Sequence, residues 1–436
     1  MFTNNFLNYS EKNYLKIGKY FFLLGVFLLP TAFAISGLFL LFSLILSFFK
    51  SKFSFLKDRV NQYIFLVIGL ILFTSIINSI NFIPTNLKDL GSSFIWLNLF
   101  NWIPALLGFI GFQSYVKSKE DRLLLSKCLI SGTIPVIASC LFHLFFEIHG
   151  PFGVLNGLIV WFHKPLEITG GVSGLFSNRN YAGFWLSVNL PFAFFFLKRN
   201  LKCKIRILPT LLISFLMMYL IIYTNSKNAL LGMISTLIVF LGVKFILISF
   251  LIIILLILLF TFEPIININI SEYIPEVFLR IRSLNFFINT PRIILFRSAI
   301  NYILQRPFLG WGSGTFAFVF LAKENMWNPP FVFYKFQHTH NLFLEMAFNF
   351  GIPIAITLTT IALFIFFKAL KILLSYEPKD DFYILDKAYI SSGIVVFLIH
   401  LSDLPFYDGK VSMLICILFS TLRSISLTKN SLKMRN

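Results

Sequence analysis

The amino-acid sequence predicts an all-α integral membrane protein of about twelve transmembrane helices, with one long loop outside the cytoplasm. Of its 436 residues, 57% are hydrophobic and only 13% are charged, and the mean hydropathy is +0.83. A soluble domain has about 45 to 50% apolar and about 25% charged residues. Apolar runs of about 18 residues or more recur along the whole chain, and each is long enough to cross a hydrocarbon core ~30 Å thick as a helix. Residues 245–262 show no alternation of polar and apolar residues, which favours helices over a closed barrel.

The apolar runs define twelve expected spans. They are 15–29, 33–49, 62–80, 93–115, 128–147, 181–197, 207–224, 229–243, 245–262, 342–367, 388–402 and 411–422. The start of the chain also imitates a secretory signal peptide that ends at Ala32-Phe33-Ala34. A further apolar run, 35–49, follows this triplet in place of a hydrophilic mature start, which favours an uncleaved helical hairpin bent at Pro30.

The distribution of the basic residues predicts the orientation of these spans. An even number of spans puts both termini on one side, and that side holds 25 of the 37 Lys and Arg residues. By the positive-inside rule it is the cytoplasmic side of the membrane. A net charge of +19 would raise nucleic acid as a partner of a soluble protein, but here the charge follows the membrane topology. The expected partner is therefore the lipid bilayer, and no nucleic acid is expected.

This topology divides the chain into three parts. Residues 1–262 form an N-terminal bundle of about nine spans, 263–341 form a periplasmic loop, and 342–436 form a C-terminal bundle of about three spans with a cytoplasmic tail. Connections longer than about 12 to 15 residues are usually functional or disordered, and this loop is too rich in Ile, Phe and Trp for disorder. It contains a helix signal, with Thr290 as the N-cap, Pro291 in the first turn and a periodic run to Gln305. We expect an amphipathic helix at the outer membrane surface, with Phe296, Ile300 and Ile303 on its apolar face.

Polar residues gather in five clusters at the outer ends of the spans, where charges are costly and persist mainly for function or pairing. The clusters are Ser177 to Tyr181, Asn225 to Asn228, Pro291 to Arg297 with Arg306 to Gly312, His338 to Asn341 with Glu345 and Gly351, and Asp403 to Phe406. All five fall on the same side in the topology that the basic residues define. Cations could bind phosphate oxygens there. A histidine could remove the proton of an acceptor hydroxyl.

Each cluster also has a simpler interpretation. Isolated interfacial cations can extend to lipid headgroups, and His338 and His340 with Glu345 could bind a metal, although no clear further ligand is present. The glycines of Gly310-Trp311-Gly312-Ser313-Gly314 favour a tight turn, because the Lys and Ser or Thr of a phosphate-binding loop are missing. An ion-coupled transporter would need ionisable groups near the bilayer midplane, and the span centres hold almost none. Transport of a small anion such as bicarbonate stays an alternative of another class.

The order of these motifs resembles the O-antigen ligase and O-antigen polymerase family, which are polyprenyl-diphosphate-dependent membrane glycosyltransferases. The motifs that carry the resemblance are Gly174 to Asn180, Asn225-Ser226-Lys227, Arg292 with Arg306 to Gly312, and His340-Asn341 followed ten residues later by Gly351. The resemblance covers about residues 170 to 365. Where the family usually has arginine, this chain has Lys227, which keeps the charge but not the bidentate geometry.

The resemblance implies transfer of a glycan from a polyprenyl diphosphate carrier on the periplasmic side, without a metal or other cofactor. The acceptor is lipid A-core or a similar molecule in a ligase, and another carrier-linked repeat unit in a polymerase; the spacing of His340, Asn341 and Gly351 favours the ligase. By position, His340 is the catalytic base. The expected donor diphosphate-binding residues are Arg292, Arg297, Lys227 and Arg179. The expected supporting residues are Asn180, His338, Asn341, Glu345 and Asp403.

Overall fold

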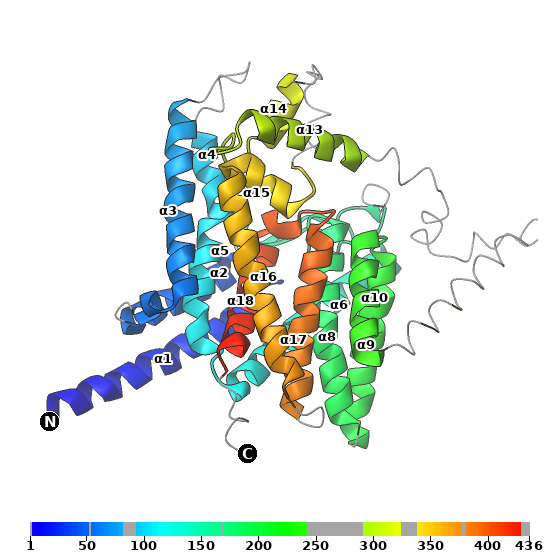
Figure 1. Cartoon of the computed structure of the whole chain (residues 1–436). Helices are drawn as coiled ribbons and strands as arrows, with labels where there is room; N and C mark the ends of the chain where they lie inside the picture. The colour runs from blue at the N-terminus through cyan, green and yellow to red at the C-terminus, as the bar shows by residue number, and fades with distance from the viewer. Residues whose placement is uncertain are drawn as a thin grey trace, which may run out of the picture. The chain divides into compact units, whose positions relative to one another are not determined.

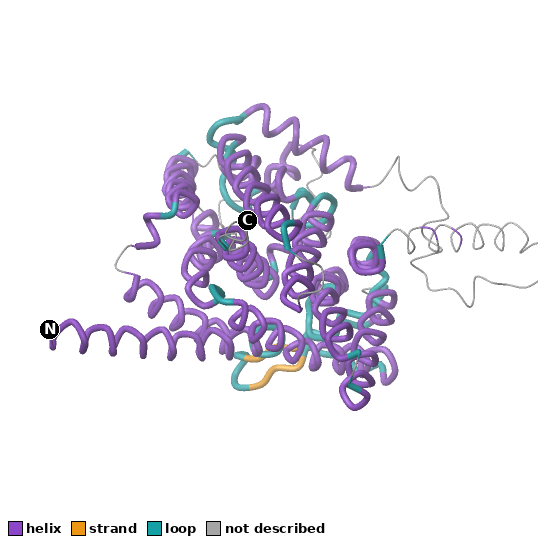
Figure 2. The backbone as a smooth tube through the Cα atoms, turned by 60° about the horizontal axis from the view of Figure 1, so that its bottom comes forward, coloured by secondary structure: helices purple, strands orange, loops and turns teal. Residues whose placement is uncertain are grey.

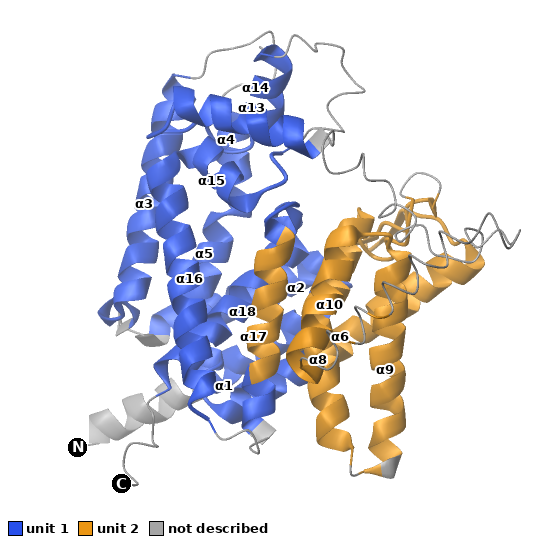
Figure 3. Ribbon diagram, turned by 45° about the vertical axis from the view of Figure 1, so that its right-hand side comes forward, with its two compact units in different colours: residues 1–128, 290–386, 400–436 blue, residues 129–289, 387–399 orange. Residues whose placement is uncertain are grey.

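The computed structural model describes residues 2–51, 54–81, 93–166, 170–201, 203–242, 247, 251, 291–323, 338–376 and 381–428. Helices make up nearly all of the regular structure of these residues, and one short hairpin is the exception (Figures 1 and 2). The chain divides into two compact units (Figure 3). Unit 1 comprises residues 1–128, 290–386 and 400–436, and unit 2 comprises 129–289 and 387–399. The all-α membrane class expected from the sequence is confirmed.

Unit 1 contains both ends of the chain and a middle part, residues 290–386, that includes the His338 to Asn341 cluster. Its helices are α1 (Phe2–Leu28), α2 (Phe33–Ser51), η1 (Ser54–Lys57), α3 (Arg59–Ile80), α4 (Ser93–Asn98), η2 (Leu99–Asn101), α5 (Ile103–Phe112), η3 (Gln113–Tyr115), α13 (Pro291–Gln305), α14 (Phe316–Lys323), α15 (Leu342–Phe350), α16 (Ile352–Leu374), η6 (Pro405–Tyr407) and α18 (Gly409–Leu427). The turn at Pro30 between α1 and α2 agrees with the expected helical hairpin.

Unit 2 consists mainly of three helices and the hairpin. They are α8 (Arg179–Asn200), α9 (Lys204–Tyr223), α10 (Lys227–Leu241), and the antiparallel strands β1 (Phe152–Val154) and β2 (Ile159–Trp161). Two further helices, α6 (Lys119–Phe146) and α17 (Asp381–His400), contribute residues to both units.

Seven helical segments of the described residues are long and apolar enough to cross a membrane. They are Arg59–Ile80, Ser93–Tyr115, Lys119–Phe146, Ile205–Tyr223, Ile352–Leu374, Phe382–His400 and Gly409–Leu427. Phe33–Phe49 and Lys227–Leu241 are shorter apolar helices. The expected span 15–29 ends one residue beyond α1, and 181–197 lies within α8. The expected span 245–262 lies outside the described residues except for positions 247 and 251. The protein is therefore multi-pass, and the count of twelve stays a prediction.

The expected single span 342–367 is wrong, because the structure breaks it into α15 and α16 at Gly351. Gly351 has a φ of 94°, and a Cβ there would lie 2.2 Å from the carbonyl oxygen of Phe308. The backbone N–H of Ile352 donates to the carbonyl of Pro307 at 2.7 Å. The segment after α13 thus approaches the backbone at the break, and only glycine leaves room for it.

The helix expected at 290–305 is present as α13, but its buried face differs from the expected one. Its inward residues are Leu295, Ala299, Tyr302 and Ile303, which join a core with α3, α14 and α15. Ile300 instead is 47% exposed. The reason is that α13 packs against α15 through the four inward residues just named. The opposite face of α13 therefore carries both apolar and charged residues. Figure 1 shows α13 and α14 beside α15.

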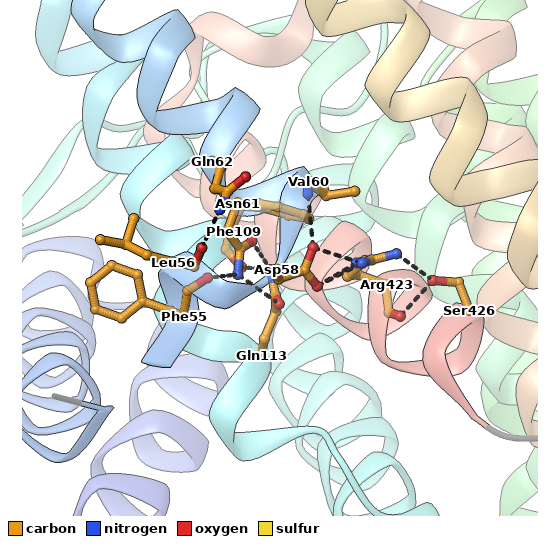
Figure 4. A network of polar contacts seen from close by, with 10 residues as sticks. All are labelled: Phe55, Leu56, Asp58, Val60, Asn61, Gln62, Phe109, Gln113, Arg423 and Ser426. Atoms are coloured by element: carbon orange, nitrogen blue, oxygen red, sulfur yellow. Dashed lines mark hydrogen bonds and ion pairs between the residues drawn. The ribbon is translucent and has the colours of Figure 1, made fainter. Parts of the chain in front are cut away.

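Two ion pairs tie distant segments of unit 1 together. Asp58 caps the start of α3 through Val60 N, and both of its oxygens accept hydrogen bonds from Arg423 of α18, at 2.6 and 2.7 Å from Nη2 (Figure 4). Arg122 of α6 donates from Nε and Nη2 to the two oxygens of Asp386 of α17, and both side chains are buried. A bidentate pair fixes the mutual orientation of its partners. These segments are therefore held in one arrangement.

Candidate active site

The His338 to Asn341 segment folds into a tight turn at the start of α15. Asn341 is the N-cap, and its side chain accepts a hydrogen bond from Leu344 N at 2.9 Å. Its amide nitrogen donates to the carbonyl of Leu401 at 2.9 Å, which joins the turn to the segment after α17. His340 has a φ of 56°, in the left-handed region that a non-glycine residue adopts at some cost. Strained residues of this kind are often found at functional sites.

His340 is paired with Asp403, 63 residues further along the chain. The Nδ1 atom of His340 lies 3.0 Å from Oδ1 of Asp403, which also accepts a hydrogen bond from Leu404 N at 2.9 Å. Asp403 is almost fully buried, and the side chain of His340 keeps 22% of its exposure. Burial would raise the pKa of Asp403, but the hydrogen bond with His340 and the charge of Arg292 lower it to about 2. Asp403 is therefore ionised at neutral pH.

His338 supports the backbone of the turn. Its Nδ1 accepts a hydrogen bond from the backbone N–H of His340 at 3.2 Å, and the two rings are 4.2 Å apart. His338 is buried, and its pKa is lowered to about 3, by desolvation first and then by its neighbours His340 and Arg292. A neutral imidazole with its lone pair on Nδ1 is the form that this hydrogen bond requires.

The two expected arginines of α13 differ in their surroundings. Arg292 Nη2 lies 3.8 Å from Oδ2 of Asp403, at the outer limit of an ion pair, and the side chain of Arg292 is 36% exposed. Arg292 thus joins His340 and Asp403 in one constellation. Arg297 is exposed, one turn further along the helix, and no ion pair is found for it among the described residues.

Glu345 lies behind the turn in a network that the sequence did not reveal. Its Oε2 accepts from Thr339 N at 2.9 Å, and its Oε1 accepts from the hydroxyl of Tyr407 at 2.6 Å and from Asn349 Nδ2 at 3.3 Å. The carboxyl is fully buried, and burial raises its pKa although the donors oppose this rise. Glu345 therefore holds the backbone of the turn against η6. Tyr407 and Asn349 carry no motif by which the sequence could have singled them out.

Unit 2 brings together the first two clusters expected from the sequence. Arg179 Nη1 and Asn225 Nδ2 both donate to the carbonyl oxygen of Gly170, the second at 2.7 Å. A Cβ at Gly171 would lie 2.3 Å from the carbonyl oxygen of Thr224, so the loop before α8 passes close to the turn between α9 and α10. The cations Arg179 and Lys227 are consequently found at neighbouring helix starts.

Both of these helix starts are capped by side chains. Asn178 accepts a hydrogen bond from the N–H of Asn180 at 2.8 Å at the start of α8, and Ser226 accepts from Ala229 N at the start of α10. Arg179, Asn180 and Lys227 are half-buried. The N-terminus of a helix carries a partial positive charge and free N–H groups. This corner of unit 2 therefore combines two side-chain cations with two helix N-termini.

The glycine-rich segment after α13 is the tight turn expected from its sequence. Gly310 has a φ of 65°, and Trp311 N and Gly312 N donate to the carbonyls of Phe348 and Asn349 at 2.7 and 3.0 Å. It packs against the end of α15. Among the described residues, no group of three or more His, Cys, Asp or Glu side chains is arranged to hold a metal.

Taken together, the described residues define a multi-pass membrane protein with a histidine and carboxylate pair beside an arginine. Residues 212–359 match the family model described as O-antigen ligase. Over these residues the chain is similar to the O-antigen ligase family, and the resemblance seen in its sequence is confirmed there. No curated protein gives a significant match to the chain. The match includes Lys227, Arg292, Arg297, His338, His340, Asn341 and Glu345, whereas Arg179, Asn180 and Asp403 lie outside it. The family supports a glycosyltransferase-type enzyme of O-antigen assembly.

Proposed function

We propose that this protein transfers a glycan from a polyprenyl diphosphate carrier to a hydroxyl of lipid A-core or a similar acceptor, on the periplasmic side of the inner membrane. The observation that carries the proposal is the pairing of His340 with the buried carboxylate of Asp403 beside Arg292. This arrangement fits a general base with an anion-binding group next to it. The family match supports a reaction of the glycosyltransferase type.

The pairing determines which nitrogen of His340 acts. An ionised carboxylate only accepts hydrogen bonds, so the proton of the neutral imidazole is on Nδ1 and the lone pair is on Nε2. In the proposed step, Nε2 takes the proton of the acceptor hydroxyl while the hydroxyl oxygen attacks the anomeric carbon of the donor sugar. The bond from this carbon to the diphosphate oxygen breaks, and the diphosphate leaves with the electron pair. The configuration at the anomeric carbon is inverted. Asp403 stabilises the imidazolium that forms.

The leaving diphosphate needs positive charge as its own charge develops. The proposed diphosphate-binding cations are Arg292 and Lys227, which the resemblance implies, and Arg297 and Arg179, which are candidates by their charge. Arg292 is positioned by Asp403, and Arg179 by the carbonyl of Gly170. Asn180 and Asn341 have a supporting role in this proposal, because they lie at the starts of α8 and α15. His338 and Glu345 support the turn at His340 by accepting hydrogen bonds from its backbone.

The proposal is tested by the envelope glycans of a deletion strain. Loss of polymer from the lipid A-core with accumulation of carrier-linked chains supports the ligase. Single repeat units on the core would instead identify a polymerase. An unchanged glycan profile, together with uptake of a labelled small anion by vesicles that contain the purified protein, would replace both with a transporter.

A further inference from the structure

A second hydrogen-bonded pair lies between the same two segments as the pair of His340 and Asp403. Five residues after His340, Oε1 of Glu345 accepts a hydrogen bond from the hydroxyl of Tyr407 at 2.6 Å. Tyr407 in turn follows Asp403 by four residues. A single contact leaves two segments free to rotate about it, whereas two contacts restrict that rotation. The pair of Glu345 and Tyr407 therefore limits how His340 can move against Asp403.

The carboxylate of Glu345 is also bonded to the backbone beside His340. Its Oε2 accepts from the N–H of Thr339 at 2.9 Å, and the hydroxyl of Thr339 donates to the carbonyl of Asn341 at 2.9 Å. His340 lies between these two residues with a φ of 56°, a conformation that its surroundings must hold in place. A fully buried carboxylate depends on its donors, because their loss leaves its charge uncompensated. The donors to Glu345 thus decide where the turn is held.

Asn349 is the second side-chain donor to this carboxylate, and it is fully buried. Its Nδ2 donates to Oε1 of Glu345 at 3.3 Å and to the hydroxyl oxygen of Tyr407 at 3.1 Å. Its Oδ1 accepts from Gly314 N at 3.3 Å, and its carbonyl accepts from Gly312 N at 3.0 Å. Asn349 therefore joins the network to the glycine-rich segment that follows α13.

We propose that Tyr407 and Asn349 are positioning residues of the transfer reaction, which hold the Glu345 carboxylate and through it set the contact between His340 and Asp403. Neither residue touches the substrate in this proposal. A displacement of about 1 Å at a catalytic group can cost up to about 10² in rate. The inference rests on the proposed function and adds two residues to its machinery.

The first test compares two buried tyrosine hydroxyls of unit 1. Tyr407→Phe removes the donor to Glu345, and Tyr115→Phe is the matched control, because the hydroxyl of Tyr115 donates to the carbonyl of Ser43 at 2.6 Å. We expect Tyr407→Phe to lower kcat about tenfold and to leave the KM for donor and acceptor unchanged, since the base is displaced and the binding groups are not. The control should keep the wild-type kcat. A wild-type kcat in Tyr407→Phe would overturn the proposal.

Asn349→Asp provides a second variant of nearly the same shape. The new carboxylate still accepts from Gly314 N, but it donates nothing to Glu345 and places a second anion beside it. Its kcat should therefore fall at least as far as that of Tyr407→Phe. A smaller fall would remove Asn349 from the positioning network.

The position of His340 is also measured without any transfer. Diethyl pyrocarbonate acylates unprotonated imidazole nitrogens, and mass spectrometry reports the rate at each histidine of the full-length protein. In Tyr407→Phe the rate at His340 should rise severalfold relative to that at the exposed His149, and in Tyr115→Phe it should not. If wild type transfers glycan while both the rate at His340 and kcat are unchanged in Tyr407→Phe, the positioning role is wrong and the enzyme assignment stands. If wild type transfers nothing but the rate at His340 rises as expected, the proposed function fails and the hold of Tyr407 on His340 stands.

Discussion

The Nδ1 atom of His340 and the Oδ1 atom of Asp403 are 3.0 Å apart, although 63 residues separate them in the chain. One residue comes from the turn before α15, and the other comes from the segment between α17 and η6. Asp403 is buried, and a buried carboxylate is costly unless its charge has a partner. The contact with His340 therefore stabilises the charged form of Asp403. Among the described residues, its charged partners are His340 and Arg292.

Replacement of Asp403 by asparagine should lower the rate of transfer by about 10² or more. An amide can donate to Nδ1 of His340, which would move the imidazole proton to Nε2 and remove the lone pair that the proposed base uses. The measurement is kcat with purified protein at saturating donor and acceptor. Asp408→Asn is the matched control, since Asp408 caps α18 and asparagine is also a good N-cap. An Asp403→Asn variant as active as the control would remove Asp403 from the mechanism.

Replacement of His340 by alanine should abolish most transfer without loss of folded protein in the membrane. A positioned general base contributes about 10² to 10⁴ in rate. His338→Ala should cost less, because His338 acts on the backbone of His340 and not on the substrate. The comparison also tests the metal alternative. Equal and severe losses in both variants, together with inhibition by a chelator, would favour a metal site over the base.

The buried His338 should make the folded protein less stable as the pH falls. Its pKa is lowered from 6.5 to about 3 on folding, so between these values the unfolded chain binds more protons than the folded one. Stability from this group is complete above pH 6.5 and declines as the pH falls toward 3. The pKa of Asp403 is lowered from 3.8 to about 2, so its contribution is lost as the pH falls from 3.8 toward 2, below the range from pH 7 to pH 5. The His338→Asn variant retains an acceptor for His340 N but has no titrating ring. Its Tm should fall less than that of the wild type between pH 7 and pH 5, and parallel curves would contradict this role.

Local sequence signals predicted the parts of the fold that depend on local physics. The Pro291 to Gln305 helix has the expected bounds, since a proline in the first turn and a periodic run determine where such a helix forms. The close turn at Gly310 was also predicted. The break at Gly351 was not predicted from the sequence. At this position the carbonyl oxygen of Phe308 approaches the backbone, and hydropathy does not reveal such a contact between separate segments. The inward face of α13 was missed for the same reason.

The candidate site was predicted in its members more than in its geometry. The cluster at the start of α15 and the later Asp403 were expected on one side of the membrane, but nothing in the sequence paired Asp403 with His340 rather than with another cation. Glu345 was expected as a supporting residue. Its partners Tyr407 and Asn349 were not, since a single tyrosine or asparagine in an apolar chain has no distinguishing pattern.

Replacement of Lys227 by arginine should maintain or raise activity, whereas alanine should lower it, mainly at limiting donor. Lys227 begins α10 next to the turn that Asn225 holds, and arginine adds the bidentate geometry that lysine lacks. The measurement is the KM for the carrier-linked donor. Lys198→Ala, an exposed lysine at the other end of α8, is the control. If Lys227→Ala has the wild-type rate at limiting donor, Lys227 does not bind the donor and contributes only to the orientation of the chain in the membrane.

The orientation of the chain predicts which side chains an impermeant thiol reagent can reach. Both termini, residues 50–59 and residues 198–206 should be cytoplasmic, and the segment that contains α13 should not, because 25 of the 37 basic residues fall on the side of the termini. The test uses a variant in which the four native cysteines are replaced. A cysteine at the exposed Asn301 of α13 should react in intact spheroplasts. A cysteine at the exposed Glu120, at the start of α6, should react only after lysis. If Asn301→Cys also reacts only after lysis, the cations of α13 face the cytoplasm. The turn at His340 belongs to the same unit as α13, so this result would exclude a periplasmic reaction at His340.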